Sequence, residues 1–129
     1  MVKSLYDTVK NNNKKIKFGI SPQGNINANY NSQYADVKLW AGTEGYADYI
    51  IPQIYFGFEN ETCPFESTLK EWEKLVKDSG TSLIIGLAEY KLGEEDKTIL
   101  FILFCLHCDK SLLLLALKAS ASNSVSVVG

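Results

Sequence analysis

The apolar positions of the chain fall into short runs, separated by polar turns and amphipathic segments. Runs at residues 16–20, 48–55 and 82–88 are rich in β-branched residues, which favours strands buried on both faces. They recur at intervals of roughly 33 residues with a helical pattern between them, as in βαβ units. Pro52 cannot donate a ladder hydrogen bond, so it is predicted to mark a bulge or the end of regular pairing. The pattern predicts an α/β fold with three parallel strands.

Amphipathic or capped segments predict the helices. Residues 4–10 are a short candidate, residues 32–43 a second one capped by Ser32, and residues 64–77 a third. The second helix has an apolar stripe of Tyr34, Val37, Trp40 and Ala41. The third has a buried stripe of Phe65, Leu69, Trp72, Leu75 and Val76. The asparagine-rich residues 25–33 are predicted to be a long loop, a kind of segment that is often functional.

Polar and aromatic residues follow each predicted strand at its C-terminal end. They are Ser21, then Gln53 and Tyr55, then Glu89 and Tyr90. Because parallel strands point the same way, we expect these side chains to gather at one rim of the sheet. Ligands are bound at that rim in parallel α/β folds. The rim is therefore the predicted functional site.

Other acidic residues have structural interpretations. Asp36 lies in the first turns of a predicted helix, where a negative charge suits the helix dipole. Asp48 opens its strand at the end of the sheet away from the rim, so we expect it to serve stability. Glu59 and Glu61 are interpreted as solvated loop residues. None of these carboxylates is predicted to be catalytic.

The composition and charge of the chain exclude one class of binding partner. The chain has 129 residues, 46% hydrophobic and 22% charged, with a formal net charge of −2. Those values fit an ordinary globular domain, and the lack of a basic cluster excludes a nucleic-acid surface. Residues 1–15 are polar and lysine-rich, without the apolar segment of a signal peptide, and the localisation of the protein stays open.

Several short motifs follow one another along the chain in a characteristic order and spacing. They are Phe18-Gly19-Ile20-Ser21-Pro22, Tyr34-Ala35-Asp36, Trp40, Gly45-Tyr46-Ala47-Asp48-Tyr49-Ile50, Pro52-Gln53-Ile54-Tyr55 and Gly86-Leu87-Ala88. Together they resemble the glycosyl hydrolase-like 10 family, from about residue 5 to residue 93. That family consists of bacterial proteins with a (β/α)8 barrel, often exported and generally assigned to glycan hydrolysis. The resemblance implies that this chain corresponds to the C-terminal half of the barrel, at roughly its last three strands.

The chain is too short for the whole barrel. A closed (β/α)8 barrel needs about 250 residues, and this chain has 129. We therefore expect a partial TIM barrel of about three βα units over residues 1–93. Residues 94–129 no longer resemble the family and form a divergent, largely apolar tail. An altered reading frame or a truncated gene is the hypothesis for that tail.

The rim carries too few acids for a complete glycosidase. Hydrolysis of a glycosidic bond ordinarily requires two positioned carboxyl groups. The paired aspartates of the family motif Asp-Asp-Tyr-Phe-Tyr-Pro belong to an earlier strand and are absent from this sequence. Glu89 is the catalytic candidate, and the candidate substrate contacts are Ser21, Gln53, Tyr55 and Tyr90. We expect a fragment of a glycoside hydrolase-like protein that acts on a polysaccharide or glycan, without the full pair of catalytic carboxyl groups and inactive alone. The alternatives are a non-catalytic carbohydrate-binding or interaction module and a gene remnant.

The tail contains three side chains that resemble a metal-binding cluster, Cys105, His107 and Cys108. A structural zinc site needs four ligands, usually from two separated pairs, and no second pair is present. The Cys-x-x-Cys spacing also matches a redox motif, but it lies in an apolar run that keeps thiols protonated. We predict no metal and no other cofactor.

Residues 99–117 of the tail form a largely apolar run that is almost long enough to span a membrane. Asp109 and Lys110 fall within that run and cost about 2.5–3.5 kcal/mol each on insertion. We predict a buried or aggregating segment and no specific membrane partner. A partial barrel exposes strand edges, so we expect self-association through them.

Overall fold

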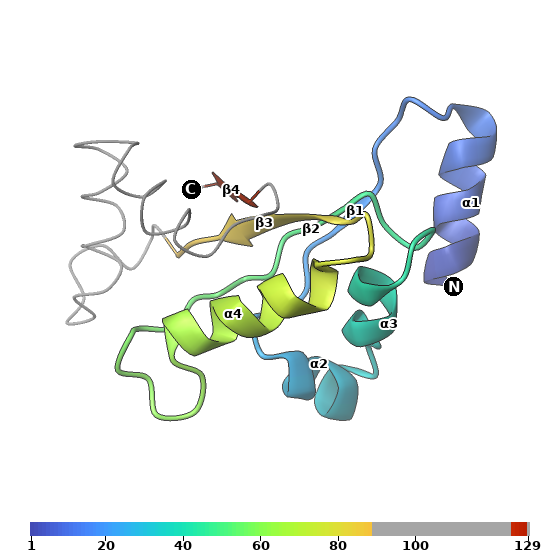
Figure 1. The fold of residues 1–129 in the computed structure, drawn as a ribbon. Coiled ribbons are helices and arrows are strands. Elements are labelled where there is room, and N and C mark those ends of the chain that lie inside the picture. The colour runs from blue at the N-terminus through green and yellow to red at the C-terminus, as the bar shows by residue number, and fades with distance from the viewer. Residues whose placement is uncertain (89–124, 129) are drawn as a thin grey trace.

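A parallel sheet organises the chain in the computed structural model, which describes residues 1–88 and 125–128 (Figure 1). Its strands are β1 (Gly19–Ile20), β2 (Tyr49–Ile50), β3 (Ser82–Gly86) and β4 (Val125–Val128), and they pair in that order. Every neighbouring pair is parallel. The prediction of an α/β fold with three parallel strands along residues 16–88 is confirmed, although regular pairing is shorter than the apolar runs.

The sequence pattern does not predict β4, which lies in the serine-rich tail. It pairs with β3 from Leu83 opposite Val125 to Gly86 opposite Val128. β3 is thus an interior strand, between β2 and β4. The valines of β4 favour a strand, but so short a run has too few positions to display a period. The sheet therefore has one strand more than expected.

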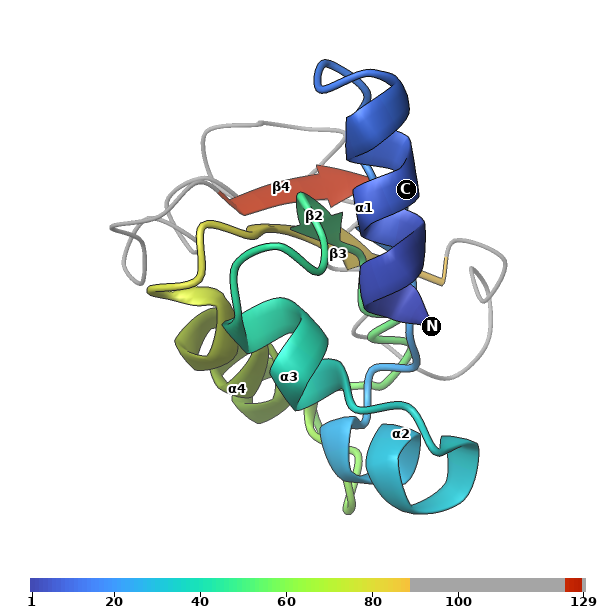
Figure 2. The ribbon, with the colours of Figure 1, turned by 90° about the vertical axis from the view of Figure 1, so that its right-hand side faces the viewer.

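Three helices lie on one face of the sheet, and the first helix lies beside its end. α2 (Ile26–Gln33), α3 (Val37–Gly42) and α4 (Phe65–Val76) lie below the strands in Figure 1, and the turned view in Figure 2 agrees. α1 (Val2–Asn12) lies at the N-terminal end of the strands, and none of its residues is buried. The helices predicted at residues 4–10 and 64–77 are confirmed as α1 and α4.

The helix predicted at residues 32–43 is confirmed only in part, as α3, and the loop predicted before it is wrong. A helix already begins after Asn25, whose side chain accepts a hydrogen bond from the N–H of Ala28 at 2.8 Å. It ends at Tyr34, which adopts a left-handed φ of 53° and is 92% exposed, so Tyr34 does not belong to the buried stripe. Asp36 then caps the separate helix α3. Two side-chain caps, not one at Ser32, divide this segment into two short helices.

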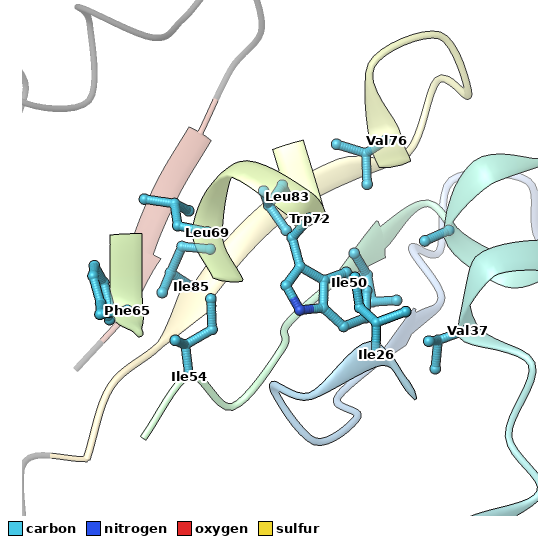
Figure 3. Close-up of a cluster of buried hydrophobic side chains, with 11 residues drawn as sticks. Ile26, Val37, Ile50, Ile54, Phe65, Leu69, Trp72, Val76, Leu83 and Ile85 are labelled. Carbon is cyan, nitrogen blue, oxygen red and sulfur yellow. The ribbon is translucent and has the colours of Figure 1, made fainter. Parts of the chain in front are cut away.

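The core lies between α4 and the sheet (Figure 3). Trp72 is fully buried there, and its indole N–H donates to the carbonyl of Gly24 at 2.7 Å. The stripe predicted for α4 is confirmed, with Phe65, Leu69, Trp72 and Val76 buried and Leu75 packed against them. The sheet contributes Ile50, Leu83 and Ile85. Burial of each such side chain is worth roughly 1.5–3 kcal/mol, so this contact fixes α4 against the sheet.

Candidate functional site

Backbone pairing continues past the ends of β1 and β2. Isolated parallel bridges join Gln23 to Gln53 and Gln53 to Gly86. The N–H of Gln53 donates to the carbonyl of Pro22 at 2.9 Å, and the N–H of Gly24 donates to the carbonyl of Gln53 at 3.1 Å. The C-terminal ends of three strands therefore form one continuous row, with Gln53 in its middle.

Pro52 lies where the regular pairing of β2 stops. The N–H of Ile51 and that of Gln53 both donate toward the β1 side. Alternate backbone nitrogens of a strand face opposite neighbours, so the nitrogen of Pro52, which has no hydrogen, faces β3. The carbonyl of Pro52 accepts a hydrogen bond from the N–H of Gly86 at 3.1 Å. The interruption predicted at Pro52 is confirmed.

Two of the predicted site residues contact each other at this row. Gln53 Nε2 donates to Ser21 Oγ at 3.2 Å, and Ser21 Oγ donates to the carbonyl of Ile51 at 3.0 Å. Ser21 is exposed and Gln53 is half-buried. The Ser21–Gln53 pair thus joins the ends of β1 and β2 and keeps neutral hydrogen-bonding groups at the surface.

The Ser21–Gln53 pair lies on the face opposite helices α2–α4. In β2, Ile50 is fully buried toward the helices, whereas Tyr49 and Ile51 on either side are half-buried. Successive side chains of a strand point to opposite faces. This alternation of burial persists through Gln53, which therefore shares the face of Tyr49 and Ile51. In a barrel, the face away from the helices is the interior.

An aromatic ring covers the start of β1 on that same face. A Cβ atom at Gly19 would lie 2.0 Å from the ring of Tyr49. Only glycine leaves room for so close an approach. Tyr49 therefore forms an apolar surface beside the N-terminal part of the row, while the polar pair lies at the C-terminal part.

Buried groups behind the rim hold the loop that follows β1. Asn29 is 2% exposed, and its Nδ2 donates to the carbonyls of Gln23 at 2.7 Å and Asn25 at 2.9 Å. Trp72 holds the next carbonyl of this loop, at Gly24, from the side of the core. Sequence reasoning missed Asn29 because an asparagine-rich run reads as a loop. The cap at Asn25 was the available signal for a helix there.

The remaining predicted site residues have different outcomes. Tyr55 follows Gln53 by two residues and is half-buried, and its N–H donates to the carbonyl of Gln53 at 3.0 Å. Glu89 and Tyr90 lie outside the described residues. The structure therefore brings Ser21, Gln53 and Tyr55 to one rim, and their role as ligand contacts stays a prediction.

The opposite end of the strands carries a charged cluster around Asp48. Its carboxylate lies 2.6 Å from Lys10 Nζ and 3.7 Å from Lys17 Nζ, and it accepts the N–H of Phe18 at 2.7 Å. Partial burial raises the pKa of Asp48, but the hydrogen bonds from Lys10 and Phe18 and the two lysine charges together lower it below its ordinary value. Asp48 fastens α1 to the sheet, in agreement with the structural role expected for it.

Other candidate chemistry is sparse in the part of the chain that the structure describes. Among residues 1–88 and 125–128, no three histidine, cysteine or acidic side chains lie close enough together to hold a metal ion. Over the same residues, no helix has the length and hydropathy needed to cross a membrane. Glu59 and Glu61 are exposed, as expected of loop residues. The segment predicted to be buried or aggregating and the cluster of Cys105, His107 and Cys108 lie outside the described residues.

Comparison with known proteins identifies the family. The sequence model of the Glycosyl hydrolase-like 10 family matches residues 1–99. Glycosyl hydrolase DigH of Escherichia coli K12 is 32% identical over 111 residues, which covers 75% of this chain and 25% of DigH. Glycosyl hydrolase YngK of Bacillus subtilis strain 168 is 35% identical over 108 residues, which covers 72% of this chain and 21% of YngK. No solved structure matches the chain.

The family match takes in all three predicted strands and every residue of the predicted rim. It includes Ser21, Gln53 and Tyr55 in the described part of the chain, and it extends past Glu89 and Tyr90. The chain spans about a quarter of the length of the curated relatives it matches. The matched residues make up most of the sequence, and the chain belongs to the Glycosyl hydrolase-like 10 family.

Proposed function

We propose that this chain is the C-terminal part of a (β/α)8 barrel in a glycoside hydrolase-like protein, and that its rim binds a glycan. The observation that carries the proposal is the Ser21–Gln53 pair, at the C-terminal ends of parallel strands and, from the alternation of burial along β2, on the face away from α2–α4. Barrel enzymes place their active sites at that end of the strands. Family membership and the shortness of the chain relative to its relatives agree with a partial barrel.

In this proposal the rim contacts the sugar through neutral groups. Gln53 supplies an amide, and Tyr55 supplies an aromatic ring and a hydroxyl, with Ser21 and Tyr90 beside them. Amides and hydroxyls match sugar hydroxyls, and aromatic rings stack on the apolar faces of sugars. Glu89 is the candidate acid or base, and a second carboxyl group comes from a part of the barrel outside this sequence. The chain alone is then inactive as a hydrolase.

The second candidate is a non-catalytic carbohydrate-binding module. It is favoured by the chemistry of the described rim residues, Ser21, Gln53 and Tyr55, which offer hydrogen bonds and an aromatic surface but no carboxylate. Both candidates predict affinity for glycans. They differ in the role of Glu89, which is one of the two carboxyl groups of a complete barrel in the first candidate and has no catalytic role in the second.

The experiment titrates the full chain with cellohexaose, xylohexaose and chitohexaose and assays each for release of reducing ends. We expect binding of at least one oligosaccharide, weakened roughly three- to tenfold by Gln53→Ala and by Tyr55→Ala. The matched controls are Gln33→Ala and Tyr30→Ala on α2, across the sheet from the rim, which should not change affinity. Unchanged affinity in both rim variants refutes the site. Both candidates predict binding without turnover for the chain alone, so release of reducing ends that Glu89→Gln abolishes would contradict both.

A partial barrel also implies association between copies. Among the described strands, β1 lies at one edge of the sheet, and an edge strand can pair with a strand of another chain. We propose that isolated chains self-associate through such edges. Sedimentation analysis over a range of protein concentrations tests this, and a monomer at every concentration contradicts it.

A further inference from the structure

The hydrogen bonds at the rim fix which way the Gln53 amide faces. Ser21 has a single hydroxyl hydrogen, and the carbonyl of Ile51 receives it at 3.0 Å. A carbonyl can only accept, so the direction of this bond is certain. Ser21 Oγ can then only accept from Gln53, across the 3.2 Å contact. The amide nitrogen of Gln53, and not its oxygen, must therefore face Ser21.

We propose that Ser21 is a positioning residue, which holds the Gln53 amide in one of its two orientations and acts on a bound sugar through Gln53. The terminal torsion of a glutamine is broad and roughly two-fold, so an unanchored amide exchanges its oxygen and nitrogen easily. The bond to Ser21 uses one amide hydrogen. The amide has a second hydrogen and a carbonyl oxygen, and the fixed orientation gives each of them a set direction.

The fixed orientation of the Gln53 amide indicates which groups of a ligand it can bind. The identification of that ligand as a sugar rests on the proposed function. A donor and an acceptor held side by side in one plane are complementary to two neighbouring hydroxyls of a sugar ring. One hydroxyl donates to the carbonyl oxygen of Gln53 and the other accepts from its N–H. The pair carries no charge, so it offers the sugar only neutral hydrogen bonds.

The anchor belongs to the backbone of the rim and not to mobile side chains. The carbonyl of Ile51 that receives the Ser21 hydrogen lies in the row that joins the strand ends, and the Gln53 backbone is bonded to Pro22 and Gly24 on the β1 side. A threonine at position 21 keeps a hydroxyl that can make both bonds. An alanine there removes both bonds and lets the amide turn.

A double-mutant cycle tests the route of action. Using the oligosaccharide that binds the full chain most tightly among cellohexaose, xylohexaose and chitohexaose, Ser21→Ala should weaken affinity roughly three- to tenfold. In the Gln53→Ala background the same substitution should have no further effect, because Ser21 acts through Gln53. Ser21→Thr should retain affinity close to that of the wild type. Additive losses in the cycle, or unchanged affinity in Ser21→Ala, would overturn the proposal.

The side-chain amide resonances of Gln53, recorded by NMR without ligand, test the anchor independently of any glycan. We expect slow hydrogen exchange at the Gln53 amide in the wild type and in Ser21→Thr, and several-fold faster exchange in Ser21→Ala. Gln33, at the C-terminal end of α2, is the internal control and should not change. Equal exchange at Gln53 in the wild type and Ser21→Ala overturns the positioning role. If the exchange result holds and no oligosaccharide binds, the positioning role stands and the proposed glycan function fails.

Discussion

The two ends of the parallel strands use their polar groups in opposite ways. At the N-terminal end, the Asp48 carboxylate contacts Lys10, Lys17 and the backbone N–H of Phe18. At the C-terminal end, the two described side chains that contact each other, Ser21 and Gln53, are neutral, and this pair retains hydrogen-bonding capacity beyond its internal contacts. One end is a charged junction whose groups contact one another, and the described part of the other end is a neutral pair of side chains.

Under the proposed function, the two ends of the sheet divide stability from binding. α1 has no buried residue, so its attachment depends on the contacts of Lys10 with Asp48 and of Tyr6 with Phe18, whose rings meet edge to face at 6.2 Å. A partly buried ion pair of this kind is costly to break and contributes nothing to a ligand. Substitutions at the N-terminal end should therefore change unfolding, and those at the rim should change binding.

The largest effect on this contrast is expected from Asp48→Asn. The substitution leaves Lys10, itself mostly buried, without its carboxylate, and should lower the free energy of unfolding by about 2–3 kcal/mol. Urea denaturation measures this loss, and oligosaccharide affinity should stay at the wild-type level. The matched control is Asp36→Asn at the cap of α3, where asparagine caps as well and the change should stay below about 0.5 kcal/mol. Equal losses in the two variants would contradict the special role of Asp48.

The contribution of Asp48 should disappear in acid. The pKa of Asp48 in the folded chain lies below its ordinary value of 3.8, so the carboxylate binds protons more readily when the chain is unfolded. Its stabilisation is therefore complete above that ordinary value and is lost as the pH falls through the folded pKa. Urea denaturation of the wild type and Asp48→Asn across acidic pH should give a stability difference that shrinks in that direction. A difference independent of pH would exclude the charge as its cause.

At the rim, Gly24→Ala should cost about 1–3 kcal/mol of stability. A Cβ atom there would lie 2.7 Å from the carbonyl oxygen of Gln53 and 2.9 Å from the ring of Phe56, so the row of strand ends must shift. Thermal denaturation measures the loss, and oligosaccharide affinity should fall with it because Gln53 moves. Gly42→Ala is the matched control: its Cβ meets nothing closer than 3.4 Å, and alanine suits a helix better by up to about 1 kcal/mol. Gly24→Ala should therefore be less stable than Gly42→Ala. The opposite order of stability would refute the packing argument.

The elements that the sequence predicts well are those whose pattern is long or buried. α4 has an apolar stripe at helical spacing and a preceding proline, and the stripe is buried as the pattern predicts. The strands can be predicted because both of their faces are apolar. The end of regular pairing in β2 can be predicted because Pro52 has no N–H to donate. The meeting of Ser21 with Gln53 at one rim also follows from parallel strands alone.

The elements that were missed depend on contacts between distant residues. The helix after Asn25 is stabilised by the buried side chain of Asn29, whose amide nitrogen donates to the carbonyls of Gln23 and Asn25. A sequence pattern of polar residues does not show that one of them is buried and makes these contacts. β4 forms a strand because its backbone pairs with that of β3. The orientation of the Gln53 amide likewise requires the carbonyl of Ile51, which no sequence pattern places there.

The smallest effect in the contrast is expected from Lys17→Met. Lys17 is 72% exposed and lies 3.7 Å from the Asp48 carboxylate, and exposed ion pairs contribute roughly 0–1 kcal/mol because water and salt screen them. Urea denaturation should therefore detect a change below about 0.5 kcal/mol, which vanishes at high salt. Lys10→Met is the matched substitution at the buried partner, only 17% exposed, and it should cost several times more and keep most of its cost in salt. Equal costs at the two lysines would mean that net charge near Asp48, and not the buried contact with α1, stabilises this end of the sheet.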